Sequence, residues 1–98
     1  AVATPHGLMV PKIRDVDQLD IKGLSQKLRT VSKLCRELKI DKKEFFGGSM
    51  TISSLGGIGG TFFTPIINSP ELSILGVVTS YDKVIKKDGQ IITRKICW

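Results

Sequence analysis

The sequence has little of the chemistry that metal sites and nucleophilic pairs need. It contains one histidine, His6, and two cysteines, Cys35 and Cys97, among 98 residues. The cysteines are too far apart for a CxxC redox pair or a tight metal clip, and with one histidine they are too few for a zinc site. We therefore expect reduced thiols and no metal. No pattern brings His6 beside Ser53 or Ser54 as a Ser-His pair requires, so His6 is interpreted as a surface turn residue.

Long apolar runs and a targeting segment are also missing. The longest apolar stretch, residues 72–78, includes a serine and falls far short of the roughly 20 residues that a membrane span needs. The opening letters AVATP have neither a basic start nor an apolar core, so they do not form a secretory signal. These absences predict a protein outside the membrane, in the cytoplasm of a bacterium or in an organelle matrix such as that of mitochondria.

Positive charge is in modest excess, with a net charge of +6 from 15 basic and 9 acidic residues. Residues 1–49 carry +4 and residues 50–98 carry +2, and basic residues alternate with acidic ones, as between Lys33 and Asp41. This mixture favours a solvated face over a polyanion-binding one, and the modest field suits a phosphate-bearing cofactor. The length and the 41% hydrophobic content predict one globular domain or part of one.

The first half of the chain changes period near residue 20. Alternating apolar residues around the turn at 5–7 predict a hairpin over residues 2–16. Apolar residues at three- and four-residue spacing between Ile21 and Leu38 then predict an α-helix, with Asp20 as its N-cap and basic residues in its last turn. Asp41 followed by Glu44 predicts one further helical turn before the glycines at 47 and 48.

The second half reads as strands and loops. Residues 49–55 alternate as a strand and run into a glycine-rich loop at 56–60, and the apolar connection 61–70 is expected to lie against another surface. Residues 72–80 have the length and composition of a buried strand. The turn signal at 86–89 predicts a hairpin, and the apolar end at 95–98 reads as the middle of a strand, which indicates a truncation or a terminus packed into a partner.

The glycine loop and the serines before it are the main candidates for chemistry. The loop matches no phosphate-binding fingerprint, because GxxxxGK[ST] is absent and no helix pattern follows, so a turn that needs positive φ is favoured. Ser53 and Ser54 lie where the strand enters the loop. A hydroxyl there could donate to a developing oxyanion or be purely structural. Asp15, Asp17 and Asp20 are not excluded as hydrolytic carboxylates, but they look like solvated and capping residues.

Several segments in register resemble the catalytic domain of the dihydrolipoamide acyltransferases of 2-oxoacid dehydrogenase complexes. They cover almost the whole chain, and details such as SSL at 53–55 look closest to bacterial pyruvate dehydrogenase acetyltransferases. The segments are ATPHGLMVP at 3–11, IRDV at 13–16, GGSMTISSLGGIGG at 47–60, TPIINSPE at 64–71 and ILGV at 74–77.

This resemblance implies an α+β, two-layer fold like chloramphenicol acetyltransferase, a mixed sheet with a flanking helix, here incomplete. It implies acetyl transfer between a dihydrolipoyl group, carried on a separate domain, and coenzyme A. Ser53 would be the catalytic donor to the oxyanion. Ser53, Ser54, Val78 and Ser80 would line the coenzyme A side. The implied partners are two further copies in a trimer that builds a larger core, and the decarboxylase and lipoamide dehydrogenase components, without nucleic acid or membrane.

The sequence also departs from the family pattern. Residues 1–98 would be the central part of the catalytic domain, without the lipoyl and peripheral-subunit-binding domains. The family's base, a histidine in a His-x-x-x-Asp-Gly motif, is not in the sequence, and a thiol with a pKa of about 8.5 needs one. His6 stands where relatives carry Asp or Asn and cannot take that role, and Ala3 replaces a usual acidic residue. We therefore expect this chain alone to be inactive.

Two other classes of function stay open at the level of sequence. One is a non-catalytic oligomeric assembly or coenzyme A-binding module, for which the apolar end at 96–98 is the motivating feature. The other is a small basic nucleic-acid binder, which rests on the net charge alone and would show steep salt-dependent retention on DNA.

Overall fold

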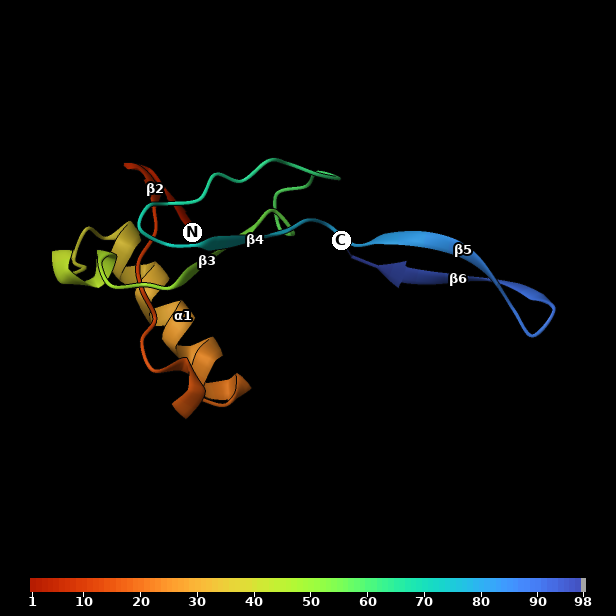
Figure 1. Ribbon diagram of the computed structural model, residues 1–98, viewed down its shortest axis with the longest axis horizontal. Coiled ribbons are helices and arrows are strands. Elements are labelled where there is room, and N and C mark those ends of the chain that lie inside the picture. The colour runs from red at the N-terminus through yellow and green to blue at the C-terminus, as the bar shows by residue number, and fades with distance from the viewer. Residues whose placement is uncertain (98) are drawn as a thin grey trace.

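The structure is a computed structural model that describes residues 1–97, and it is α+β as the sequence predicts (Figure 1). The strands form three separate two-stranded sheets, one parallel and two antiparallel, so the expected single mixed sheet is not present within these residues. Single 3₁₀ turns cover Val16–Gln18 and Lys42–Phe45. The remaining elements are β1 (Val2–Thr4), β2 (Gly7–Met9), α1 (Ile21–Arg36), β3 (Met50–Ser54), β4 (Ser73–Val77), β5 (Tyr81–Lys87) and β6 (Gln90–Ile96).

Helix α1 begins and ends where the sequence predicts to within two residues. The Asp20 carboxylate accepts a hydrogen bond of 2.7 Å from the backbone N–H of Gly23, which satisfies one of the free donors of the first turn. The expected apolar face is only partly buried. Val31 and Cys35 are buried, whereas Ile21 is 87% exposed, because α1 makes its main contact with β1, where Val31 and Cys35 pack with Val2.

The core of the N-terminal part is small. Val2 of the β1–β2 hairpin packs with Val31 and Cys35 of α1, and Met9 and Ile40 lie against this group. Cys35 is fully buried and unpaired, as expected for a reduced thiol, and its burial raises the pKa of the thiol.

The first residue links this core to the neighbouring sheet. The backbone nitrogen of Ala1 donates a hydrogen bond of 2.9 Å to the carbonyl oxygen of Ile52 in β3.

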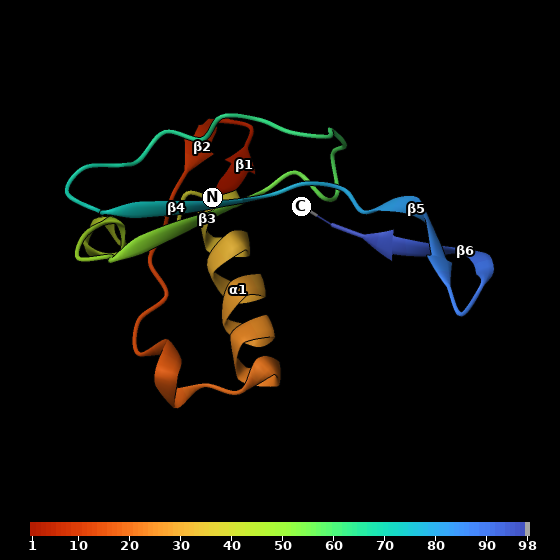
Figure 2. The ribbon, with the colours of Figure 1, turned by 45° about the vertical axis from the view of Figure 1, so that its right-hand side comes forward.

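Strands β3 and β4 form the parallel sheet, with Ser53 opposite Gly76 and Thr51 opposite Ile74. The connection 61–70 runs along the side of this sheet opposite α1 in both ribbon views (Figure 1 and Figure 2). The prediction of a buried strand at 72–80 is wrong for most of its length: Leu72 is 88% exposed and only Val78 is buried. The sheet has only two strands, and Ile52 and Leu75, whose side chains point to one face of it, are 55% and 50% exposed.

The connection 61–70 itself contacts the sheet less than expected. Phe63 lies against Gly76, but Phe62 and Ile66 are 87% and 81% exposed. The expectation that this segment packs against another surface therefore holds for Phe63 and not for the other two side chains.

Strands β5 and β6 form the predicted hairpin, which projects away from the rest of the molecule (Figure 1). Its turn residues Asp88 and Gly89 have φ of 52° and 77°, as a tight hairpin turn of the Asp-Gly type requires. The projection gives extents of 55 × 28 × 27 Å and a radius of gyration of 16.7 Å, against about 13 Å for a compact chain of this length. No helix within residues 1–97 combines the length and apolar character of a membrane crossing.

Candidate active site

The four residues predicted for catalysis and coenzyme A binding lie together at one end of the parallel sheet. Ser53 and Ser54 end β3, and Val78 and Ser80 follow the last residue of β4. The carboxyl ends of parallel strands meet at one edge of a sheet, where α/β proteins commonly bind ligands. Their grouping agrees with a shared site, while their individual roles stay predictions.

Ser53 is half-buried and its hydroxyl makes no hydrogen bond within residues 1–97. It faces the same side of the sheet as Thr51 and as its partner Gly76, because alternate residues of a strand point to opposite faces. Gly76 has no side chain, and the ring of Phe63 lies against it on the β4 side. The Ser53 hydroxyl, without a hydrogen-bond partner within residues 1–97, is free to donate to another group.

A cavity of about 250 Å³ opens on the Gly76 side of Ser53. A Cβ on Gly76 would lie 2.9 Å from Cζ of Phe63, so the glycine is what lets the aromatic ring approach the sheet. Val78, one of the predicted binding residues, contributes to the same cavity. Its lining residues are Thr61, Phe62, Phe63, Pro65, Gly76 and Val78.

Ser54 differs from Ser53 in both direction and bonding. It points to the opposite face of β3, and its Oγ accepts a hydrogen bond of 3.3 Å from the backbone N–H of Gly56. The loop that follows is a turn with φ of 111° and 121° at Gly59 and Gly60, so the interpretation of the glycines as a positive-φ turn is confirmed. Ser54 is thus engaged in starting the turn.

The end of β4 is tied to the glycine loop and to the end of β6. The hydroxyl of Thr79 donates a hydrogen bond of 2.7 Å to the carbonyl oxygen of Gly60. The thiol of Cys97 donates to the carbonyl oxygen of Val78 at 2.9 Å. Val78 is held in a buried position by these neighbours, whereas Ser80 is exposed just before β5 begins.

His6 and the three aspartates of the sequence analysis lie where a turn residue, solvated residues and a helix cap are expected. His6 is exposed in the turn between β1 and β2, and its backbone N–H donates to Thr4 Oγ1 at 3.1 Å. Asp15 and Asp17 are exposed, and Asp20 caps α1. Within residues 1–97 no group of three or more His, Cys, Asp and Glu side chains could hold a metal ion.

Sequence analysis missed a buried polar cluster formed by Lys12, Thr51 and Glu71. Lys12 Nζ donates to Glu71 Oε2 at 2.6 Å, and Thr51 Oγ1 donates to Glu71 Oε1 at 2.5 Å. The side chains of Lys12 and Glu71 are 10% and 5% exposed. The hydrogen bond from Lys12, followed by that from Thr51, holds the pKa of the Glu71 carboxyl below its usual value. The partners are 59 and 20 residues apart in sequence, so no local pattern announces the cluster.

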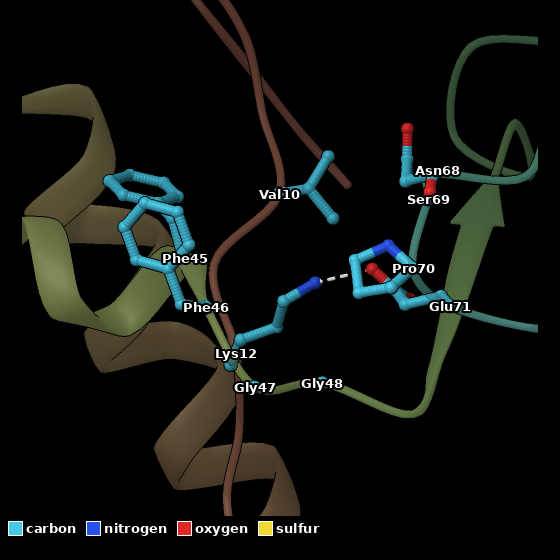
Figure 3. Close-up of a pocket in the computed structure, with 10 residues that line it drawn as sticks. All are labelled: Val10, Lys12, Phe45, Phe46, Gly47, Gly48, Asn68, Ser69, Pro70 and Glu71. Carbon is cyan, nitrogen blue, oxygen red and sulfur yellow. Dashed lines mark hydrogen bonds and ion pairs between the residues drawn. The ribbon is translucent and has the colours of Figure 1, made fainter.

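The Lys12–Glu71 pair lies in a second cavity, of about 340 Å³ (Figure 3). The rings of Phe45 and Phe46 stand on one side of Lys12, and Pro70 stands beside Glu71 on the other. The lining residues are Val10, Lys12, Phe45, Phe46, Gly47, Gly48, Asn68, Ser69, Pro70 and Glu71.

Arg14 fixes the segment that carries the two aromatic rings. Its Nη2 donates to the carbonyl oxygens of Lys43 and Phe46, at 2.9 and 2.7 Å. The wall of the cavity is thus attached to the same extended segment that carries Lys12.

Comparison with known proteins places this geometry among acyltransferases. All 98 residues match the family of 2-oxoacid dehydrogenases acyltransferase (catalytic domain). The chain is 46% identical over 94 residues to the dihydrolipoyllysine-residue acetyltransferase component of the pyruvate dehydrogenase complex of Cupriavidus necator, covering 96% of this chain and 17% of the relative.

Two solved structures are also similar. One is Azotobacter vinelandii dihydrolipoamide acetyltransferase, studied for the role of a serine, a histidine and an asparagine in its catalytic mechanism; it is 41% identical with a TM-score of 0.91, covering 98% of this chain and 40% of that one. The other is the cubic core of a pyruvate dehydrogenase multienzyme complex. It is 41% identical with a TM-score of 0.89, and the match covers 96% of this chain and 39% of that one. Both the sequence and the fold of residues 1–97 therefore agree with the resemblance, and the chain belongs to the 2-oxoacid dehydrogenase acyltransferase family, within its catalytic domain.

Proposed function

We propose that the protein carrying this chain transfers an acetyl group between a dihydrolipoyl thiol and coenzyme A as part of a pyruvate dehydrogenase complex. The relatives named above support the reaction, and the chain spans 17% of the length of the Cupriavidus necator protein and about 40% of the solved chains. The whole protein's activity is thus inferred from the part that is similar. The chloramphenicol-acetyltransferase-like fold belongs to the same proposal.

The Ser53 hydroxyl is the observation that carries this function. One thiolate attacks the thioester carbonyl of the other substrate, the carbonyl oxygen becomes an oxyanion, and collapse of the tetrahedral species expels the second thiolate. Ser53 has a hydroxyl at a strand end that makes no hydrogen bond among residues 1–97 and can donate to that oxyanion, whereas Ser54 already accepts a hydrogen bond from the loop. The serine studied in the Azotobacter vinelandii enzyme supports this assignment.

The attacking thiol also needs a base, because a thiol with a pKa of about 8.5 is mostly protonated at neutral pH. His6, the one histidine of the sequence, is exposed in the β1–β2 turn. We assign the proton acceptor to a part of the protein outside residues 1–97. The histidine studied in the Azotobacter vinelandii enzyme supports a base of that type.

Coenzyme A binding is proposed at the edge formed by Ser53, Ser54, Val78 and Ser80. The grouping of these residues and the net charge of +6 support a phosphate-bearing ligand there. The dihydrolipoyl arm would approach the same serine from a separate domain.

Assembly into a homotrimer and then a larger core is proposed for the protein. The similarity to a solved cubic core supports it, and so does the unusual number of exposed apolar side chains for so small a chain. The decarboxylase and lipoamide dehydrogenase components would be its partners, in the bacterial cytoplasm or the mitochondrial matrix. Examples of the exposed apolar residues are Ile52, Phe62, Ile66, Leu72 and Leu75.

The test is acetyl transfer from acetyl-coenzyme A to dihydrolipoamide by the intact protein and by Ser53→Ala. We expect kcat to fall by roughly 10²- to 10³-fold, as for loss of one oxyanion donor. Ser49→Ala, at an exposed position just before β3, is the matched control and should keep the wild-type kcat. An unchanged kcat in Ser53→Ala would contradict the role of this serine.

The exposed apolar side chains also favour a second candidate, a non-catalytic module that assembles or binds coenzyme A without turnover. It predicts an oligomer by analytical ultracentrifugation and no acetyl transfer in the intact protein. Transfer that depends on Ser53 would exclude it.

A further inference from the structure

We propose that the buried cluster of Lys12, Thr51 and Glu71 positions Ser53 for catalysis by holding β3 in place against the segment that leads into β4. This inference rests on the proposed acetyl transfer and assigns three positioning residues to it. None of the three is expected to touch the substrate.

The first step is the location of Thr51. It precedes Ser53 by two residues on β3, so both side chains point to the same face, about 7 Å apart along the strand. Thr51 is 4% exposed and its hydroxyl donates to Glu71 Oε1 at 2.5 Å. A displacement of Thr51 would therefore move the strand that presents Ser53.

The second step is the location of Glu71. It lies two residues before β4, and β4 places Gly76 opposite Ser53. Its two carboxylate oxygens accept from different segments of the chain, one from Thr51 and the other from Lys12. Its backbone N–H donates to the carbonyl oxygen of Asn68 at 2.8 Å, which fixes the turn before it. One carboxylate thus joins the segment before β4 to β3, through Thr51, and to the segment that carries Lys12.

The third step is the rigidity of Lys12. Its backbone N–H donates to the carbonyl oxygen of Glu44 at 2.6 Å. A Cβ on Gly48 would lie 2.6 and 2.7 Å from Cδ and Cε of Lys12, so the lysine stem fits closely along the Gly48 backbone. Lys12 is thus held at its backbone and along its side chain, so its ammonium is a fixed counter-ion for Glu71 (Figure 3).

The test is a double-mutant analysis of Thr51 and Ser53 in the intact protein. Thr51→Val keeps the shape and removes the hydroxyl, and we expect it to lower kcat for acetyl transfer by roughly 10- to 100-fold, as for small misplacement of a catalytic group, with little change in KM. Thr51→Ser should restore most of the rate. In a Ser53→Ala background the same Thr51→Val change should lower kcat by less than about twofold, because the group being positioned is gone.

The matched control removes an ion pair elsewhere. Asp82→Asn breaks the exposed Lys95–Asp82 pair of the β5–β6 hairpin and should leave kcat unchanged. Equal losses from Thr51→Val in the two backgrounds, or no loss in either, would overturn the inference. An unchanged kcat in Ser53→Ala would instead overturn the proposed role of the serine.

A second measurement reports positioning without depending on turnover. Amide hydrogen exchange of β3 should accelerate by roughly tenfold or more in Glu71→Gln and Thr51→Val, while exchange in β5 and β6 stays at the wild-type rate. Unchanged exchange at residues 52–54 in both variants would overturn the inference even if the protein transferred no acetyl group.

Discussion

Two Lys–carboxylate pairs lie in contrasting parts of this molecule. Lys12 and Glu71 meet at 2.6 Å beside Thr51 of the parallel sheet, with side chains 10% and 5% exposed. Lys95 and Asp82 meet at 3.2 Å across the β5–β6 hairpin, with side chains 70% and 65% exposed. The same two functional groups are desolvated in one place and hydrated in the other. Burial, rather than the presence of an ion pair, decides what the pair does for the fold.

The β5–β6 hairpin and the β3–β4 sheet differ in how far apart in sequence their contacting residues lie. The β5–β6 hairpin is built from residues close in sequence and a tight Asp-Gly turn, so local residues specify its register. The β3–β4 sheet joins strands separated by an 18-residue connection, and it is held by Glu71 and by the bond from Thr79 to Gly60. The strand that carries Ser53 therefore depends on distant contacts.

The largest effect is expected from breaking the buried pair. Lys12→Met would leave the Glu71 carboxylate without its counter-ion in a site that water barely reaches. We expect the urea midpoint of the intact protein to fall several times further than for Lys95→Met. Equal shifts for the two variants would show that burial does not distinguish the pairs.

Glycine substitutions give the next largest effect, with similar losses of stability in the two sheets and different effects on activity. A Cβ at Gly76 would lie 2.9 Å from Phe63, and overpacking of this kind costs about 1–3 kcal/mol. Gly89→Ala meets open space but must adopt φ of 77°, which costs about 1–2 kcal/mol. Urea unfolding checks both, and only Gly76→Ala should also reduce acetyl transfer, because Phe63 would move beside Ser53. Loss of acetyl transfer in Gly89→Ala would contradict the expectation that only the β3–β4 sheet affects activity.

Acid unfolding tests the buried Glu71 carboxylate and is expected to show a smaller effect than these substitutions. The pKa of Glu71 is lowered in the folded state by its bonds from Lys12 and Thr51, so folding favours the ionised form. Its stabilisation is complete above the ordinary pKa of 4.5 and is lost as pH falls from there through the lowered pKa. Thermal melts of Glu71→Gln should depend less on pH below 4.5 than those of the wild type. A wild-type pH dependence in Glu71→Gln would contradict this assignment.

The smallest effect is expected at the exposed pair. Lys95→Met should change the free energy of unfolding by less than about 1 kcal/mol, because both charges are hydrated and screened by salt. The difference from wild type should shrink further when NaCl is raised to about 1 M. A large, salt-independent loss would show that the hairpin pair is as important as the buried one.

Local signals in the sequence predicted the elements well. Asp20 marks the start of α1, the Asp88-Gly89 turn marks the hairpin, and the glycines after Ser54 mark a positive-φ turn, because each of these depends only on neighbouring residues. The candidate serine at a strand end came from the same alternation.

Burial and long-range polar contacts could not be predicted. Leu72 reads as a core residue from its apolar context, but burial needs a partner surface, and none covers it within residues 1–97. Lys12, Thr51 and Glu71 look like ordinary strand and loop residues, and only the fold brings them within hydrogen-bonding distance.

The central claim, that the Ser53 hydroxyl stabilises the oxyanion, is tested most directly by comparing kcat for acetyl transfer between Ser53→Thr and Ser53→Ala in the intact protein. Threonine keeps the hydroxyl and fits a strand. We predict that Ser53→Thr retains most of the activity that Ser53→Ala loses. Wild-type activity in Ser53→Ala would contradict it.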